Sequence, residues 1–349
     1  MSLRVNEITS SSQLTDIKED WNRILATSGE DEVFLRTEWI LTWWKFFGEG
    51  RKMVLLEVTD GPTVVGYAPL MISRVGKVPP WKVIEFIASD ASDLSAIISE
   101  RGRTDVHQCV WSYVHQLGDW DSINIRNMRK GSPTAECVLT EFKDCNISTE
   151  VSPYIPVKSS YDEFLRNLEH KHRHNLLRYW RRLKENHTCE FKVNKNTDTV
   201  CEYIDAFIYL MKARWDMRRE KSVTEIPGMA EFIKSAFEAL AEKGWASVHS
   251  LEEKGEPFAI GLGFEYNRRY LCYLSAFDPR YAIYSPGTLL LDCVIKMCHD
   301  KGLLEVDLLR GAEPYKYRLG AIDRELIGVS KERKRLIKGI LRNVRTKLK

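Results

Sequence analysis

The densest group of side chains that could do chemistry lies in residues 307–318, which read Asp-Leu-Leu-Arg-Gly-Ala-Glu-Pro-Tyr-Lys-Tyr-Arg. They follow an apolar run that predicts a strand, and ligands of α/β proteins bind outside the carboxyl ends of strands. Asp307 or Glu313 could act as a general base, and Tyr315 or Tyr317 could protonate a leaving thiolate. The cations that could hold phosphate or stabilise an oxyanion are Arg310, Lys316 and Arg318. The alternative is a solvated loop with surface ion pairs.

A second group precedes an expected helix, where Ser285 and Pro286 form a helix-start pattern. The first turn of a helix offers free backbone N–H groups and a positive dipole end, which together can hold a pyrophosphate. Gly287 would let a phosphate approach the backbone, and Ser285 and Thr288 could add hydroxyl donors. The alternative is a well-capped helix with no ligand.

Two basic segments stand out from a chain whose formal net charge is only +3. Residues 171–184 hold six Lys or Arg and no acid, and Arg173 and Arg178 are candidate contacts to RNA, a nucleotide or a lipid-linked phosphate. Residues 331–349 hold nine Lys or Arg and predict a basic amphipathic helix, suited to an anionic membrane surface or to packing on its own domain. A solvated helix face is the alternative for the first segment.

The sequence does not predict a metal or redox site. The eight cysteines form no CxxC pair, and the histidines form a single i,i+4 pair, His170 and His174. A serine nucleophile elbow, a P-loop and a dinucleotide fingerprint are also missing. Because no apolar run approaches membrane-spanning length and the N-terminus lacks a signal-peptide pattern, we expect a cytosolic protein.

The pattern of apolar residues predicts alternating helices and strands that could position these groups. The elements expected in the first part are helices over 14–25, 37–47 and 104–116 and strands over 53–59, 64–72, 82–87 and 122–125. Those expected in the second part are helices over 160–184, 200–219, 229–243 and 285–300 and strands over 246–252, 257–266, 269–277 and 304–309.

The order helix, strand, Gly-containing turn, strand occurs in both parts of the chain. It suggests two copies of one α/β unit, each a mixed central sheet flanked by helices. We therefore predict an N-terminal domain over residues 1–157 and a C-terminal domain over 158–330 that carries the groove. The basic helix over 331–349 would follow.

The order of several motifs resembles a known family. These motifs are Phe34-Leu-Arg-Thr-Glu-Trp39, Trp43-Trp44, Gly66-Tyr-Ala-Pro-Leu70, Asn175-Leu-Leu-Arg178, Tyr281-Ala-Ile-Tyr-Ser-Pro-Gly-Thr288 and Leu309-Arg-Gly-Ala-Glu-Pro-Tyr-Lys-Tyr-Arg318. They resemble the CelD/BcsL-type GNAT acyltransferases, bacterial proteins linked to cellulose, other exopolysaccharides or the cell envelope. That family is related to the FemABX aminoacyl-tRNA transferases, and both have a tandem GNAT-like fold.

The resemblance implies transfer of an acyl group, most simply acetyl, from acyl-coenzyme A to an amine or hydroxyl, without a covalent enzyme intermediate. It implies that residues 278–288 and 310–318 line the groove, which adds Asp278 and Tyr284 as candidate substrate contacts. Lys316 matches a lysine that contacts phosphate in FemABX-like proteins, so Lys316→Ala should weaken donor binding more than folding.

The resemblance also leaves two alternatives open. The usual GNAT phosphate loop is replaced by Tyr284-Ser-Pro-Gly-Thr288, so a charged tRNA could be the donor in place of acyl-coenzyme A. A non-catalytic module that keeps the fold is the second alternative. The expected acceptor is a small molecule, a glycan or a lipid-linked compound, reached from the cytoplasm or at the inner face of the membrane.

Overall fold

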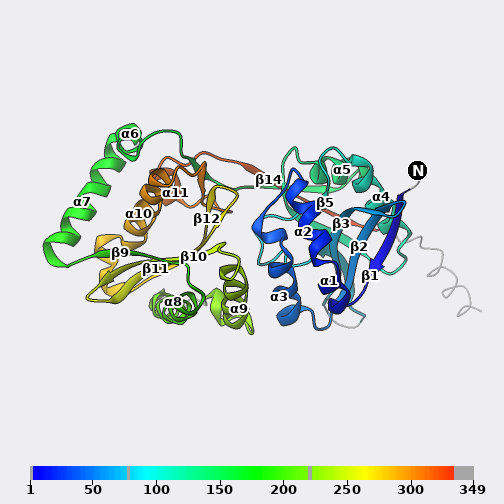
Figure 1. Cartoon of the computed structure of the whole chain (residues 1–349), viewed down its shortest axis with the longest axis horizontal. Helices are drawn as coiled ribbons and strands as arrows, with labels where there is room; N and C mark the ends of the chain where they lie inside the picture. The colour runs from blue at the N-terminus through cyan, green and yellow to red at the C-terminus, as the bar shows by residue number, and fades with distance from the viewer. Residues whose placement is uncertain (1–2, 77–78, 219–221, 334–349) are drawn as a thin grey trace, which may run out of the picture.

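The computed structural model describes residues 3–76, 79–218 and 222–333, and these form two halves that lie side by side (Figure 1). The first half contains β1 (Leu3–Ile8), α1 (Ser11–Asp16), α2 (Lys18–Thr27), α3 (Thr37–Phe47), β2 (Lys52–Asp60), β3 (Thr63–Val75), β4 (Trp81–Phe86), β5 (Ile98–Ser99), α4 (Thr104–Gln116), β6 (Ser122–Arg129), α5 (Pro133–Glu141) and β7 (Asn146–Val151).

The second half contains β8 (Tyr154–Pro156), α6 (Tyr161–Asn167), α7 (His170–Asn186), β9 (Glu190–Asn194), α8 (Thr197–Arg218), α9 (Met229–Ala241), β10 (Ala246–Glu253), β11 (Glu256–Tyr266), β12 (Arg269–Phe277), α10 (Pro286–Asp300), β13 (Glu305–Asp307) and α11 (Pro314–Arg318). The last described strand, β14 (Glu325–Glu332), follows α11. Short 3-10 turns η1 (Val33–Leu35), η2 (Val223–Glu225) and η3 (Pro279–Tyr284) complete the order.

The first sheet has the strand order β1-β2-β3-β4-β6-β14-β7, with β5 beside β3. Its strand β14 comes from the end of the described chain and pairs antiparallel with both β6 and β7. The second sheet has the order β8-β13-β12-β11-β10-β9. Each half is therefore a mixed sheet flanked by helices, as the sequence predicts.

The domain limits differ from the predicted ranges at both ends. β8 already belongs to the second sheet, so the chain crosses between the halves near Pro153 and not after residue 157. The chain then returns to the first half through β14, which lies inside the predicted second domain. The helix predicted over 331–349 begins inside this strand, and residues 334–349 lie outside the described residues.

The predicted helix starts are close to those observed. Ser160 caps α6 by accepting a hydrogen bond from the Glu163 N–H at 3.3 Å, and the helical stretch breaks before α7 begins. The helix predicted over 37–47 is α3, which begins at Thr37 and has Arg36 at its N-cap. Within the described residues, no helix is long and apolar enough to cross a membrane.

One hydrophobic core joins the halves. The rings of Phe34 and Trp39 from the first half pack against Phe264, and Trp39 also packs edge-on against Phe232 of α9. Because these rings are fully buried, each half covers apolar surface of the other. The two halves therefore behave as one packed body around the site described next.

Candidate active site

A cavity of about 460 Å³ lies between β12, the start of α10, the ends of α8 and α9, and a loop of the first half. Its volume is in the range of ligand-binding pockets. Of the predicted site residues, those in its wall are Gly287, Arg310, Glu313, Tyr315 and Lys316. The two regions singled out in the sequence thus meet at one cavity, together with residues the sequence did not indicate.

The cavity exists because two parallel strands separate. β12 pairs with β13 only from Arg269↔Glu305 to Leu271↔Asp307. Beyond that point β12 continues from Cys272 to Phe277, whereas the segment that follows β13 turns away from it. Within the described residues no strand pairs with this edge of β12 after Leu271, although the Ser275 oxygen accepts a hydrogen bond from Arg214 at 3.4 Å. The other backbone groups at this edge could pair with an extended ligand.

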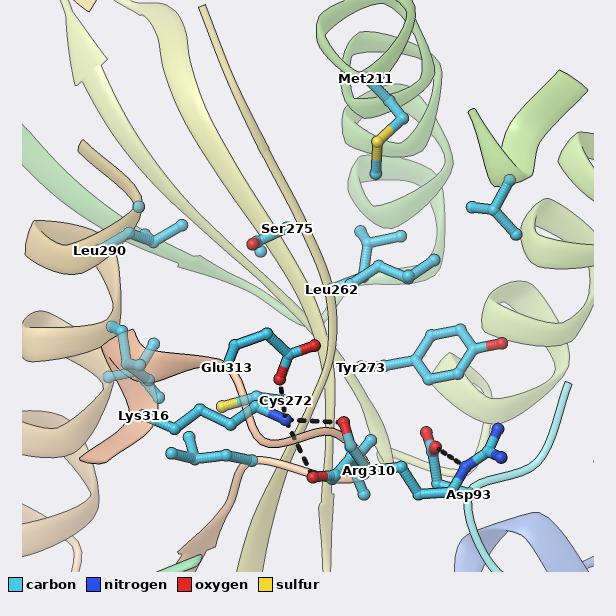
Figure 2. A pocket seen from close by; sticks show the side chains of 18 of the residues that line it. Asp93, Met211, Leu262, Cys272, Tyr273, Ser275, Leu290, Arg310, Glu313 and Lys316 are labelled. Atoms are coloured by element: carbon cyan, nitrogen blue, oxygen red, sulfur yellow. Dashed lines mark hydrogen bonds and ion pairs between the residues drawn. The ribbon is translucent and has the colours of Figure 1, made fainter. Parts of the chain in front are cut away.

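Lys316 is a buried clamp, with only 2% of its surface exposed. Its Nζ donates to the backbone oxygens of Leu309, Arg310 and Gly311 at 3.0, 2.7 and 3.0 Å. Figure 2 shows this nitrogen between Glu313 and Arg310. An ammonium group has three N–H donors, and these three oxygens share them with the Glu313 carboxylate. Contrary to the sequence-based expectation, Lys316→Ala should therefore disturb the fold of this loop as well as any ligand contact.

Glu313 lies at the cavity with about half of its side chain exposed, 2.9 Å from Lys316 Nζ. Gly311 makes this position possible, because a Cβ there would lie 2.6 Å from the Glu313 carboxylate, and its φ of +105° also favours glycine. The carboxylate is thus held beside a cation yet open to a ligand, which is the arrangement a general base requires.

Tyr315 and Cys272 complete the centre of the cavity wall. Partial enclosure raises the pKa of the Tyr315 phenol, so it keeps its proton at neutral pH and can donate it. Burial likewise raises the pKa of the Cys272 thiol. A neutral thiol is a poor nucleophile, so this environment does not favour Cys272 as a nucleophile.

Arg310 joins the two halves at the cavity. Its guanidinium lies 2.5 Å from Asp93 and donates to Asn127 Oδ1 at 3.1 Å, and both partners belong to the first half. Burial raises the pKa of Asp93, although the Arg310 charge acts in the opposite direction. The Arg310 guanidinium therefore connects the two halves at the cavity. Its predicted contact to phosphate would have to be made in addition to these bonds.

Asp307 does not line the main cavity. Its buried carboxylate accepts from Arg324 at 2.9 Å and from the Leu309 N–H at 2.9 Å. Burial raises its pKa to about 6, although the charge of Arg324 opposes this shift. These contacts place it beneath the loop, where it fixes the turn after β13 and cannot reach a ligand in the cavity. They do not support its predicted role as a base.

The start of α10 is partly as predicted. Ser285 stands at the N-cap with Pro286 next, but it has a φ of +55° and its side chain makes no capping hydrogen bond. Gly287 faces the cavity, whereas Thr288 bonds through its N–H to the Ser285 oxygen at 2.9 Å and does not line it. The backbone of the first turn, more than the hydroxyls, adjoins the cavity.

The predicted substrate contacts lie outside the cavity wall. Asp278 accepts from Arg280, Tyr284 is buried against His187, and Arg318 is exposed. On α7, Arg173 donates to the Arg166 oxygen and Arg178 lies over the ring of Tyr179. None of these residues lines the cavity, so none is placed to contact a ligand inside it.

Sequence reasoning did not find the residues that the first half contributes to the cavity. Asp90, Ala91 and Asp93 come from a loop after β4 and line the cavity. Asn127 holds this loop by donating to the oxygens of Ser89 and Ser92 at 2.9 and 2.8 Å. No local pattern marks such a loop, because only the packing of the halves brings it to the site.

The second half carries a recognised domain. Residues 170–317 match the family model described as an acetyltransferase (GNAT) domain. Solved structures are similar over nearly the whole chain. FemX is 12% identical with a TM-score of 0.61, and the alignment covers 93% of this chain and 96% of that one. A conserved protein of unknown function from Bacteroides thetaiotaomicron is 10% identical with a TM-score of 0.59, covering 93% and 100%.

A third solved structure has two such domains in one chain. It is a tandem GNAT protein from the clavulanic acid biosynthesis pathway, 12% identical with a TM-score of 0.54, covering 95% of this chain and 98% of that one. The present chain has a tandem GNAT fold. A comparison with curated proteins found no match.

The predicted tandem GNAT architecture is thus confirmed, and the cavity lies in the C-terminal GNAT unit with a wall supplied by the N-terminal one. At identities near one residue in eight, the solved neighbours establish the fold and leave the chemistry to the site. Among the described residues, no group of three or more His, Cys, Asp or Glu could hold a metal ion.

Proposed function

We propose that this protein is an acyltransferase that moves an acyl group from acyl-coenzyme A to an amine or hydroxyl. One observation carries the proposal. The cavity passes through the gap between β12 and the segment after β13, with the first turn of α10 at its wall and Glu313 beside its centre. The match of residues 170–317 to a GNAT acetyltransferase domain supports it.

The donor would bind along the gap. The first turn of α10, at Gly287, presents backbone N–H groups and a positive dipole end to the donor phosphates. The amide-containing arm of coenzyme A is extended and could pair with the free edge of β12 in the manner of an added strand. The thioester would then lie near Cys272, at the centre of the cavity.

Transfer would be direct. Glu313 would take the proton from the acceptor, and the attacking amine or hydroxyl would form a bond to the thioester carbon as the bond to sulfur breaks. The Tyr315 phenol could return a proton to the leaving thiolate. Lys316 would act by holding the loop of residues 309–313 and the Glu313 carboxylate in place.

Replacing the proposed base tests this function. Glu313→Gln should lower kcat/KM for coenzyme A release, measured over a panel of amines and hydroxyl compounds, by about 10²- to 10⁴-fold. Glu256→Gln, in the exposed β10–β11 turn outside the cavity wall, serves as the matched control. Unchanged coenzyme A release by the Glu313 variant would contradict the proposed base.

The acceptor is proposed from the resemblance to CelD/BcsL-type proteins. It would be an amine or hydroxyl compound of exopolysaccharide, cellulose-type, or cell-envelope biosynthesis, glycan or lipid-linked. The protein would act in the bacterial cytoplasm or at the inner face of the membrane. Exposed polar groups at the cavity, Asp90 and Glu313, are suited to a polar acceptor.

A second candidate is an aminoacyl-tRNA-dependent transferase. The FemX likeness and the basic residues of α7 favour it. The exposed ones are Lys171, Arg178, Arg181, Arg182 and Lys184, and Arg173 is partly buried. Binding of charged tRNA that weakens steeply with added salt, and that Arg181→Glu and Arg182→Glu reduce, would support this donor over coenzyme A. Salt-independent or absent tRNA binding would exclude it.

A further inference from the structure

The cavity has two halves, one on each face of the second sheet. On the α10 face its wall is formed by Gly287, Leu290 and Val294. On the opposite face lies a chamber formed by Met211, Val223, Met229, Ile233, Leu262 and Tyr273, which we term the far chamber. Figure 2 shows Leu290 on one side of the strands and Met211, Leu262 and Tyr273 on the other.

The far chamber presents carbon to a ligand. Met229 and Ile233 stand one helical turn apart on α9 and face the same space, and Leu262 of β11 closes it. The bordering polar groups already have partners. The Tyr273 hydroxyl donates to the Ala91 oxygen at 3.1 Å, and Asp93 pairs with Arg310. The Arg214 guanidinium of α8, which also borders the cavity, lies over the Phe277 ring and donates to the Ser275 oxygen at 3.4 Å. A polar ligand would lose its hydration here without replacement, whereas a hydrocarbon would gain by leaving water.

The cavity that includes the far chamber is much larger than an acetyl group needs. The whole cavity measures about 460 Å³, whereas a methyl group occupies a volume close to that of one water molecule, about 30 Å³ in the liquid. An acetyl group at the gap would leave the apolar walls beyond it uncovered. Methionine side chains such as Met229 adapt to a flexible chain, so they suit a hydrocarbon of variable shape.

The direction of the donor decides what fills the chamber. With the donor phosphates at Gly287 and the thioester in the gap beside β12, the acyl group would extend through this gap toward Met229 and Ile233. The acceptor has another route, because Asp90, Glu313 and Tyr315 are exposed at the cavity and form its polar side. The apolar side therefore falls to the acyl chain.

We propose that the far chamber binds the hydrocarbon chain of the acyl donor, so that the preferred donor carries a chain several carbons longer than acetyl. This inference rests on the acyl-coenzyme A donor proposed above. It assigns Met229, Ile233 and Leu262 as residues that determine chain length. It also replaces acetyl, the simplest expectation from the sequence, with a medium-length acyl group.

Binding of a donor series to the full chain tests the inference. Calorimetric titrations would use free coenzyme A and its acetyl, hexanoyl and decanoyl thioesters. Each buried methylene should tighten binding by up to about fourfold, the equivalent of about 0.8 kcal/mol, until the chamber is full. If coenzyme A and acetyl-coenzyme A bind but longer chains bind no better, the inference fails and the proposed function stands. If none of the four binds, both fail.

Variants assign the gain to the chamber. Met229→Gln and Ile233→Trp should weaken decanoyl-coenzyme A by about tenfold or more, the effect of several lost methylene contacts, and leave free coenzyme A unchanged. Met297→Gln is the matched control, because Met229 and Met297 are 7% and 9% exposed and Met297 lies outside the cavity wall. An equal loss in the control would refute the assignment.

A further titration tests whether the far chamber binds an apolar acceptor instead of the acyl chain of the donor. Hexylamine and ethanolamine would be titrated against the protein saturated with coenzyme A. If Met229→Gln weakens hexylamine and spares decanoyl-coenzyme A, the chamber holds an apolar acceptor and the donor assignment is overturned. Sensitivity of decanoyl-coenzyme A alone supports it.

Discussion

Tyr270 lines the cavity with its ring and directs its hydroxyl into the sheet, 2.8 Å from His249 Nδ1. Gly263 permits this, because a Cβ at that position would lie 2.1 Å from the Tyr270 hydroxyl. His249 is fully buried, and burial lowers its pKa to about 3, with further lowering by Lys301 and Lys195. The ring is thus neutral at physiological pH and can accept the Tyr270 proton, while its other nitrogen lies 3.4 Å from the Ser247 hydroxyl.

Because burial keeps His249 neutral, we expect the free energy of unfolding to depend on pH. The unfolded chain binds the proton near pH 6.5 and the folded chain only near pH 3, so stability is complete above pH 6.5 and falls as the pH drops. From pH 7 to pH 5 the share of His249 is about 2 kcal/mol. His249→Asn should lose this share of the slope in urea unfolding at the two pH values, even if it is less stable at pH 7.

The control for that measurement is His170→Asn on α7, where the side chain is exposed. An unchanged slope in His249→Asn would show that the folded protein takes up the proton, so that the buried ring is not held neutral. His107 is a second buried histidine whose pKa burial lowers to about 4, so some slope should remain in the variant.

At the scale of single residues, the sequence predicted which segment lines the cavity better than it predicted what each side chain contacts. The cluster at 307–318 was expected to hold the site, and Glu313 and Tyr315 do line the cavity. The role of Lys316 could not be read from its neighbours, because its partners are three backbone oxygens brought together by the turn at Leu309 and Gly311. Side-chain type alone cannot show that such donors are already engaged.

At the scale of elements, the Lys316 side chain fixes the conformation of the loop between β13 and α11 through its hydrogen bonds to three backbone oxygens. Lys316→Met should leave the oxygens of residues 309–311 without their donor and lower the free energy of unfolding by at least about 2 kcal/mol. Arg318→Met, two residues on and exposed, is the control. Urea unfolding measures both. A stable Lys316 variant that binds coenzyme A weakly would instead support the phosphate role expected from the sequence.

Helices and hairpins were predictable, and short or distant strands were not. The strands β10, β11 and β12 and the helices α9 and α10 were expected within a few residues, because each has strong apolar periodicity and clear turn or cap signals. No strand was expected at β14, whose residues were divided between the range of the second domain, 158–330, and the C-terminal helix, 331–349. Its burial depends on β6 and β7, which are far away in the sequence.

At the scale of the whole molecule, buried ion pairs hold the two GNAT units together. Glu32 of the first unit is 3% exposed and lies 2.8 Å from Arg269 of β12 and 2.5 Å from Arg129 of β6. Burial raises the pKa of Glu32, but the charges of Arg269 and Arg129 outweigh it and hold the pKa below its usual value. The carboxylate is therefore charged at neutral pH and completes the contact between the units.

Removing this charge should be costly. Glu32→Gln leaves two arginines partly unpaired in the interface and should lower the free energy of unfolding by about 3–5 kcal/mol. Glu325→Gln breaks only the exposed pair with Lys130 and should cost less than about 1 kcal/mol. Thermal unfolding compares the two variants. Similar small losses would mean that the apolar contacts of Phe34 and Trp39, and not Glu32, hold the units together.

The place of β14 has a consequence for biosynthesis. During translation the ribosome delivers β6 and β7 long before β14, and at usual elongation rates the delay is roughly 10–35 s. Through that interval the nascent first sheet has an open slot whose unpaired strands could join another chain. The second unit must emerge before the first sheet can be completed, so both mature together, and a chaperone that shields strand edges would improve the yield of native protein.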